Sequence, residues 1–195
     1  MSRVRRGLLS AAVLTAASIV GAVPVAAARP ANHCVNPAGA DLNAVYQTND
    51  AFITPFCTDA HSGDWWRPLL RWLGAATHDV IPEGYIPSGA TPRADFLGKL
   101  QSARYVVDAG TARERSYTVE VRRLIIATGE VPDGTEFVAF TPRLHPLPPG
   151  AHTVDIYVTL SEENWDGLGL EPENHSAAGE SLVSSVAFVV HKRSA

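Results

Sequence analysis

A strict alternation of side chains near the C-terminus constrains the fold of this chain more than any other feature. Between residues 152 and 161, apolar positions and polar positions follow one another without a break. The inward set is His152, Val154, Ile156, Val158 and Leu160, and the outward set is Thr153, Asp155, Tyr157, Thr159 and Ser161. Successive side chains of a strand point to opposite faces of a sheet, so this pattern predicts a strand with one buried face.

Further segments with strand character precede and follow this one. They cover residues 103–108, 116–126, 136–144 and 181–191, and in the last of them Leu182, Val186, Phe188 and Val190 share a face. A short helix or turn is predicted over residues 92–101. Short strands joined by turns favour an antiparallel β-sandwich over a fold of alternating strands and helices. The predicted class is therefore mainly β, with the sandwich over residues 93–191.

Two motifs in this region resemble a known family. Residues 147–154 (LPPGAHTV) resemble the L-x-P-G-x-H/Y-T-V turn and strand of exported bacterial immunoglobulin-like β-sandwich domains, and residues 186–190 (VAFVV) resemble their closing strand. The resemblance covers residues 103–191. It implies an antiparallel immunoglobulin-like sandwich, and it carries no functional residues across.

Residues 29–92 differ in composition from the predicted sandwich. They are rich in proline, and most of this segment is predicted to form loops. Their one helical signal spans residues 64–74 (DWWRPLLRWLG), with apolar residues at helical spacing. These residues are Trp65, Leu69, Trp72 and Leu73. The spacing predicts a short helix that buries this stripe and leaves Trp66 as the one tryptophan of the helix exposed for a ligand.

The two cysteines of the chain, Cys34 and Cys57, both fall in this N-terminal segment. An even, isolated pair in an exported protein predicts a disulfide. The bond would tie the loop-rich segment together.

The first 28 residues have the pattern of a secretory signal peptide. A basic start with Arg3, Arg5 and Arg6 is followed by an apolar stretch over residues 8–23 and by three alanines at 26–28. Such a pattern predicts cleavage near Arg29 and a secreted, extracytoplasmic protein of bacterial style. The apolar stretch is short for a membrane span, so no membrane insertion is expected once the signal is removed.

Charge excludes two classes of partner. The chain has 16 Lys and Arg against 20 Asp and Glu, and three of the arginines lie in the signal peptide. Nucleic-acid binding and docking on anionic lipid both require clustered basic residues. The expected partner is therefore an extracellular protein or a glycan.

The long connection over residues 161–180 is the best candidate site. It holds several carboxylates and no Lys or Arg, and long loops on a rigid scaffold are often functional. Three interpretations stay open: a Ca²⁺ site built from Asp166, Glu171 and Glu173, a partner-recognition loop around Trp165 and His175, or a plain solvated acidic loop. The Ca²⁺ site would be the only cofactor site.

Other polar groups admit both chemical and structural interpretations. His145 and His152 flank the same proline-rich turn, and His152 is interpreted as a residue at the edge of the core with a hydrogen-bonded ring. Residues 59–64 (DAHSGD) bring Asp, His and Ser together in sequence, but a catalytic triad requires them to converge in space. Five arginines could pair with the acidic loop or bind an anionic ligand: Arg104, Arg113, Arg115, Arg122 and Arg123.

The sequence thus predicts a secreted, non-catalytic protein with a binding, adhesion or envelope-structural role. The alternative is a secreted metal-dependent hydrolase that uses the acidic loop 161–180. An enzyme would place Glu171, Glu173 or His175 in a concave pocket, whereas a binding module would present an ordered, exposed loop.

Overall fold

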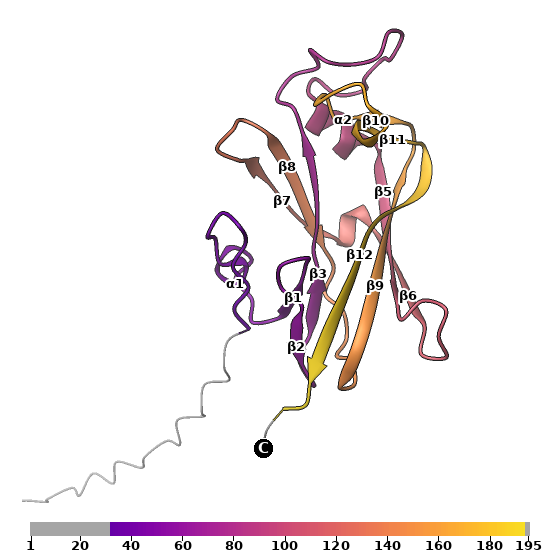
Figure 1. Cartoon of the computed structure of the whole chain (residues 1–195). Coiled ribbons are helices and arrows are strands. Elements are labelled where there is room, and N and C mark those ends of the chain that lie inside the picture. The colour runs from indigo at the N-terminus through magenta and orange to yellow at the C-terminus, as the bar shows by residue number, and fades with distance from the viewer. Residues whose placement is uncertain (1–31, 194–195) are drawn as a thin grey trace, which may run out of the picture. The chain divides into compact units, whose positions relative to one another are not determined.

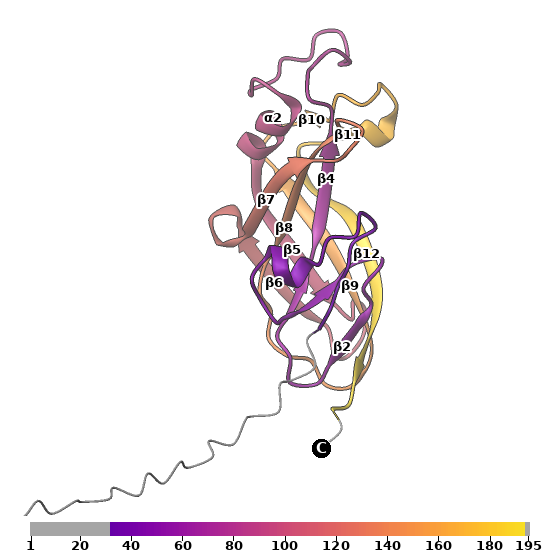
Figure 2. The same ribbon diagram turned by 90° about the vertical axis from the view of Figure 1, so that its left-hand side faces the viewer.

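Two β-sheets share one hydrophobic core in the computed structural model, which describes residues 32–193 (Figures 1 and 2). The protein is mainly β, as predicted. The predicted signal peptide, residues 1–28, lies outside the described residues.

The larger sheet contains five strands in the order β2-β12-β9-β5-β6. Their bounds are Asp59–His61 (β2), Gly179–His191 (β12), Gly150–Leu160 (β9), Leu100–Val107 (β5) and Arg115–Glu120 (β6). All neighbours are antiparallel except β2 and β12, which run parallel.

The smaller sheet contains three antiparallel strands in the order β4-β8-β7. Their bounds are Leu70–Gly74 (β4), Glu136–Thr141 (β8) and Ile125–Glu130 (β7). Two further pairs are β1 (Ala51–Ile53) with β3 (Trp66–Pro68) and β10 (Asn164–Trp165) with β11 (His175–Ser176). The helices are α1 (Leu42–Val45), α2 (Pro92–Lys99) and two 3₁₀ turns, η1 (Val121–Arg123) and η2 (Pro172–Asn174).

The alternation in β9 is confirmed. All five inward residues from His152 to Leu160 are buried, and the four from Val154 to Leu160 belong to the same hydrophobic core as Val138 and Phe140 of β8 in the other sheet. The short helix or turn predicted over residues 92–101 is a helix, α2, that ends at Lys99, and Leu100 already begins β5. The Thr91 side chain accepts a hydrogen bond from the Ala94 amide, and Pro92 occupies the first turn.

β12 departs from the predicted pattern at one position. Val186, Phe188 and Val190 are buried as expected, but Leu182 is 55% exposed. A bulge between Leu182 and Ser184 inserts one extra residue into the strand, which reverses the alternation on its N-terminal side. The prediction that Leu182 shares their inward face is wrong for this reason.

The helix predicted over residues 64–74 is also wrong, because this segment forms β3 and β4. Trp66 is buried in the core, which excludes the predicted exposed role, and its indole donates to the His145 carbonyl. In β4, Leu70 and Trp72 pack against the core while Arg71 is exposed. Two short strands joined at Leu69 therefore placed apolar residues at a spacing that imitates a helix.

The single strand predicted over residues 116–126 is divided in the structure. The chain leaves the larger sheet after β6, turns through η1 and enters the smaller sheet as β7. Leu124 is buried at the crossing, so the apolar pattern continues although the strand does not.

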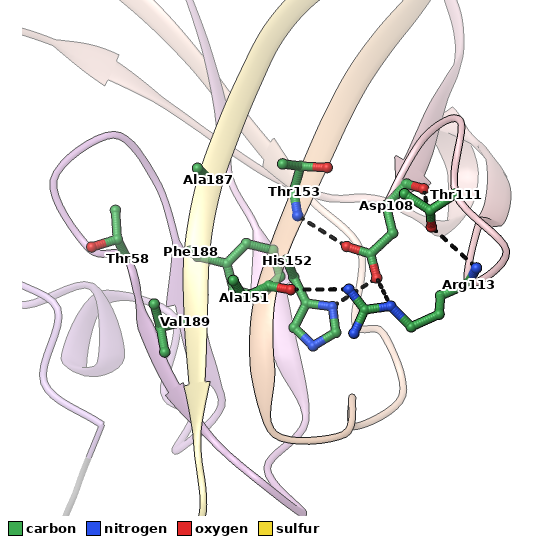
Figure 3. Close-up of a pocket in the computed structure, with 10 residues that line it drawn as sticks. All are labelled: Thr58, Asp108, Thr111, Arg113, Ala151, His152, Thr153, Ala187, Phe188 and Val189. Carbon is green, nitrogen blue, oxygen red and sulfur yellow. Dashed lines mark hydrogen bonds and ion pairs between the residues drawn. The ribbon is translucent and has the colours of Figure 1, made fainter.

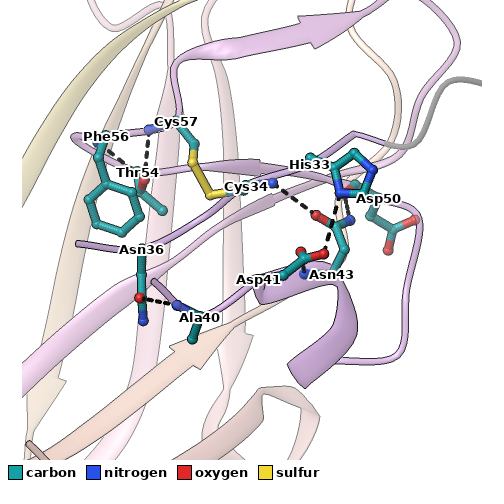
Figure 4. Close-up of a disulfide and its surroundings, with 10 residues drawn as sticks. All are labelled: His33, Cys34, Asn36, Ala40, Asp41, Asn43, Asp50, Thr54, Phe56 and Cys57. Carbon is teal, nitrogen blue, oxygen red and sulfur yellow. Dashed lines mark hydrogen bonds and ion pairs between the residues drawn. A yellow bond between two sulfur atoms is a disulfide. The ribbon is translucent and has the colours of Figure 1, made fainter. Parts of the chain in front are cut away.

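The predicted disulfide joins Cys34 and Cys57 (Figure 4). Beside it, the Asn43 side chain accepts a hydrogen bond from the Cys34 amide and donates to the carbonyls of Thr48 and Asp50. Asp50 in turn binds the buried Arg67 and the half-exposed Arg143, so the segment is joined by ion pairs to β3 and to the chain after β8.

Candidate functional site

The loop that follows β9 has secondary structure of its own. Residues 161–178 include the β10–β11 pair, and the Asp166 amide donates to the Asn174 carbonyl. The Ala75 amide donates to the Asp166 carbonyl at 2.7 Å, which joins this loop to the segment 75–91. Both lie at the same end of the sheets, next to α2 (Figures 1 and 2). We call residues 75–91 and 161–178 the loop end.

A buried ion pair lies beneath the loop end. Asp95 and Lys99 occupy successive turns of α2, and their side chains are 0% and 3% exposed with Nζ and Oδ2 at 3.0 Å. Lys99 also donates to the Tyr85 hydroxyl and to the Glu163 carbonyl, both at 2.7 Å. The three hydrogens of the ammonium group thus have three acceptors, one from each of three chain segments.

Asp95 is the centre of the same network. Its carboxylate accepts hydrogen bonds from the Tyr85 hydroxyl, from the amide and hydroxyl of Ser88, and from the Asn164 side chain at 2.8 Å. Asn164 is itself 1% exposed and belongs to β10. One carboxylate therefore holds α2, the segment 75–91 and the start of the loop 161–178.

The network also sets the charge states of its members. Burial alone would raise the pKa of Asp95, but hydrogen bonds from Tyr85, Ser88 and Lys99 outweigh it and lower that pKa well below its ordinary value. Burial would lower the pKa of Lys99, whereas its bonds to Tyr85 and Asp95 raise it. Both groups are charged in the folded protein, and burial together with the bond to Asp95 raises the pKa of Tyr85.

The structure brings the two predicted partner-contacting residues together. Trp165 and His175 are opposite each other in the β10–β11 pair, and their rings stack with centroids 4.6 Å apart. The His175 ring also lies 3.2 Å from the Glu163 carboxylate. Both side chains are half-buried, so each presents part of its surface to solvent.

The three predicted Ca²⁺ ligands have separate environments. Burial raises the pKa of Asp166, whose carboxylate accepts the Leu168 amide. Glu171 accepts from the Asn174 side chain, and Glu173 is exposed. In residues 32–193 no three His, Cys, Asp or Glu side chains are grouped so as to hold a metal ion. Ca²⁺ binding here remains a prediction.

The surface of the loop end combines apolar and acidic side chains. Ile86 and Leu170 are 85% and 57% exposed, and Val80 and Leu168 are exposed as well. The same two segments also carry exposed carboxylates, and neither segment contains a Lys or Arg. The carboxylates belong to Asp79, Glu83, Glu162, Glu163, Glu171 and Glu173.

A second site lies at the other end of β9, around His152 and Asp108 (Figure 3). The His152 Nδ1 is 2.8 Å from Asp108 Oδ2, and Nε2 is 2.9 Å from the Pro148 carbonyl. Asp108 also accepts from the Thr153 amide and lies 3.6 Å from the Arg113 guanidinium. The prediction of a hydrogen-bonded histidine at the edge of the core is confirmed.

These contacts occupy both ring nitrogens of His152. The Asp108 carboxylate lies at Nδ1 and the Pro148 carbonyl at Nε2, so the ring is held by the two ends of the neighbouring chain segments. His145 has different partners, since its ring packs on Trp65 at 4.4 Å.

The Asp-His-Ser sequence at residues 59–64 does not assemble a triad. Asp59 binds His191 of β12 at 2.7 Å, and the Ser62 hydroxyl accepts from the Arg193 amide. His61 lies beside Asp64 instead, with 3.9 Å between the ring and the carboxylate.

The predicted arginine cluster is dispersed among separate partners. Arg104 forms two hydrogen bonds with Glu180, at the end of the acidic connection, while Arg122 pairs with the neighbouring Glu120. Arg113 pairs with Asp108 at the second site.

No protein-family model, curated protein or solved structure matches this chain. Within residues 32–193 the structure has no helix that is long and apolar enough to cross a membrane.

Replacing Asp95 with Asn should destabilise the fold and change its response to acid. Lys99 would keep a buried charge without a carboxylate, which costs about 3–5 kcal/mol of unfolding free energy. Because folding lowers the pKa of Asp95, its contribution is present above the ordinary Asp pKa of about 4 and is lost as the pH falls below it. Urea unfolding at several pH values should show that the free energy of unfolding falls less in acid for the variant than for the wild type.

Glu180→Gln is the matched control, since it breaks the exposed pair with Arg104 and should cost only about 0–1 kcal/mol. Equal unfolding midpoints for Asp95→Asn and Glu180→Gln would contradict a central role for the buried pair.

Proposed function

We propose that this is a secreted, non-catalytic binding protein that contacts an extracellular partner through the loop end. In this proposal the two sheets form an immunoglobulin-like β-sandwich that acts as the scaffold. The signal-like leader and the disulfide between Cys34 and Cys57 support export to an oxidising compartment.

The observation that carries the proposal is the order of the loop 161–178. A solvated connection needs no buried anchor, yet Asn164 is buried on Asp95 and the Glu163 carbonyl accepts from Lys99. Holding a loop in one conformation reduces the entropy that binding would otherwise cost. A rigid scaffold with ordered loops at one end is the usual arrangement of a binding module.

The exposed side chains of the loop end indicate how a partner would be bound. Ile86, Leu168 and Leu170 supply apolar area at the centre of such a contact, where burial contributes most to affinity. The exposed carboxylates of the same segments favour a partner with basic groups, since complementary charge mainly increases the association rate.

Replacing Leu170 with Ser should abolish capture of the partner. The immobilised wild-type protein, incubated in native extracellular medium, should retain a partner whose release increases with salt, because the contacts with the carboxylates are between charges. The retained protein is identified by mass spectrometry, and its amount is compared between variants.

Val45→Ser is the matched control, because Val45 is 56% exposed and Leu170 is 57% exposed, but Val45 lies in α1 outside the loop end. It should retain the partner at the wild-type level. Partner retention by Leu170→Ser at the wild-type level would contradict the proposal.

A further inference from the structure

We propose that the pocket beside Arg113 binds a small carboxylate with an apolar body. The pocket lies between the start of β9, the end of β12 and the connection from β5 to β6, and its volume is about 400 Å³ (Figure 3). It is at the opposite end of β9 from the loop 161–178. The inference therefore goes beyond the proposed function and does not depend on it.

Short side chains on neighbouring strands make this part of the sheet hollow. Ala151 of β9 is paired with Val189 of β12, and Ala187 of β12 is paired with Thr153 of β9. All four are exposed on the outer face of the sheet. The buried residues Phe188 and His152 also line the pocket. A pocket of this size with a mainly apolar lining and few polar groups is typical of small-molecule sites.

Arg113 supplies the charge for an anionic group. Its Nε lies 3.6 Å from Asp108, and its Nη2 donates to the Ala151 carbonyl at 3.3 Å. These two contacts place the guanidinium at the edge of the pocket, where the Arg113 side chain is 57% exposed. The group has five N–H donors in all. The remaining donors can bind a carboxylate, for which the planar guanidinium is well matched.

The polar groups of the lining favour an anionic group over a neutral one. Asp108 is the one carboxylate among the described residues that line this pocket, and it already has the Thr153 amide and the His152 ring as partners. Arg113 is the one Lys or Arg of this lining, and its guanidinium keeps N–H donors beyond its contacts with Asp108 and Ala151. The neighbouring Glu114 does not line the pocket, and its carboxylate accepts a hydrogen bond from the Gly110 amide at 2.7 Å.

Titration with 3-phenylpropionate, followed by amide NMR, tests this inference. The acid should shift the amide signals of residues 108–113, 151–153 and 187–189 in a saturable way. Its neutral amide and acetate should each bind at least about tenfold more weakly, because one lacks the charge-assisted bond and the other lacks the apolar body. Equal binding of the acid and its amide, shifts elsewhere, or no saturable binding would overturn the proposal.

Two arginine variants separate the pocket from general charge effects. Arg113→Gln should weaken binding of the acid by about tenfold or more. Arg122→Gln removes the same charge from an exposed arginine that pairs with Glu120, and it should bind as the wild type does. Similar affinities for the two variants would overturn the proposal.

Ala187→Glu provides a further variant on an outward position of β12. Its carboxylate would occupy the pocket and repel an anion, so it should prevent binding while the rest of the amide spectrum is retained. If Arg113→Gln fails to fold, this variant decides the question: undiminished binding of 3-phenylpropionate would overturn the proposal.

Discussion

The organisation of the loop end depends on one buried ion pair, Asp95 with Lys99. A buried pair is weak evidence for stability, because removing both charges from water costs about as much as their attraction returns. Its effect here is on specificity. The Asp95 carboxylate accepts hydrogen bonds from Tyr85, Ser88 and Asn164, and the Lys99 ammonium donates to the Glu163 carbonyl. Any other arrangement of these segments would leave a buried charge without its hydrogen bonds. The ion pair therefore selects one conformation of two loops that contribute no residue to the main hydrophobic core.

The parts of the fold that could be predicted from the sequence are those determined by local pattern. β9 alternates without interruption, α2 begins with Thr91 followed by Pro92, and the two cysteines have only each other as partners. The errors arise where tertiary contacts override the pattern. Trp66 lies in a strand because it packs on Phe188, and Leu182 faces solvent because a bulge between Leu182 and Ser184 reverses the alternation.

The candidate sites were predictable to a similar extent. The composition of residues 161–180 identified the loop, and Trp165 and His175 lie together as a result of the β10–β11 pairing. The network beneath it could not be found, since Asp95 and Lys99 have the four-residue spacing of an ordinary surface pair on a helix, and Tyr85 and Asn164 are distant in sequence. The pocket beside Arg113 depends on which residues of β9 and β12 are paired, and no local pattern encodes that register.

Hydrogen exchange measured by mass spectrometry tests most directly whether the buried pair organises the loop end. In Lys99→Met, which keeps the volume of the side chain but leaves Asp95 without its cation, residues 75–91 and 161–178 should exchange faster than in the wild type. The part of β9 before residue 160 and the part of β12 after residue 185 should exchange as slowly as in the wild type, because the pairing of these two strands does not involve Lys99. Unchanged exchange in the two loops, or an equal increase across both sheets, would contradict this account.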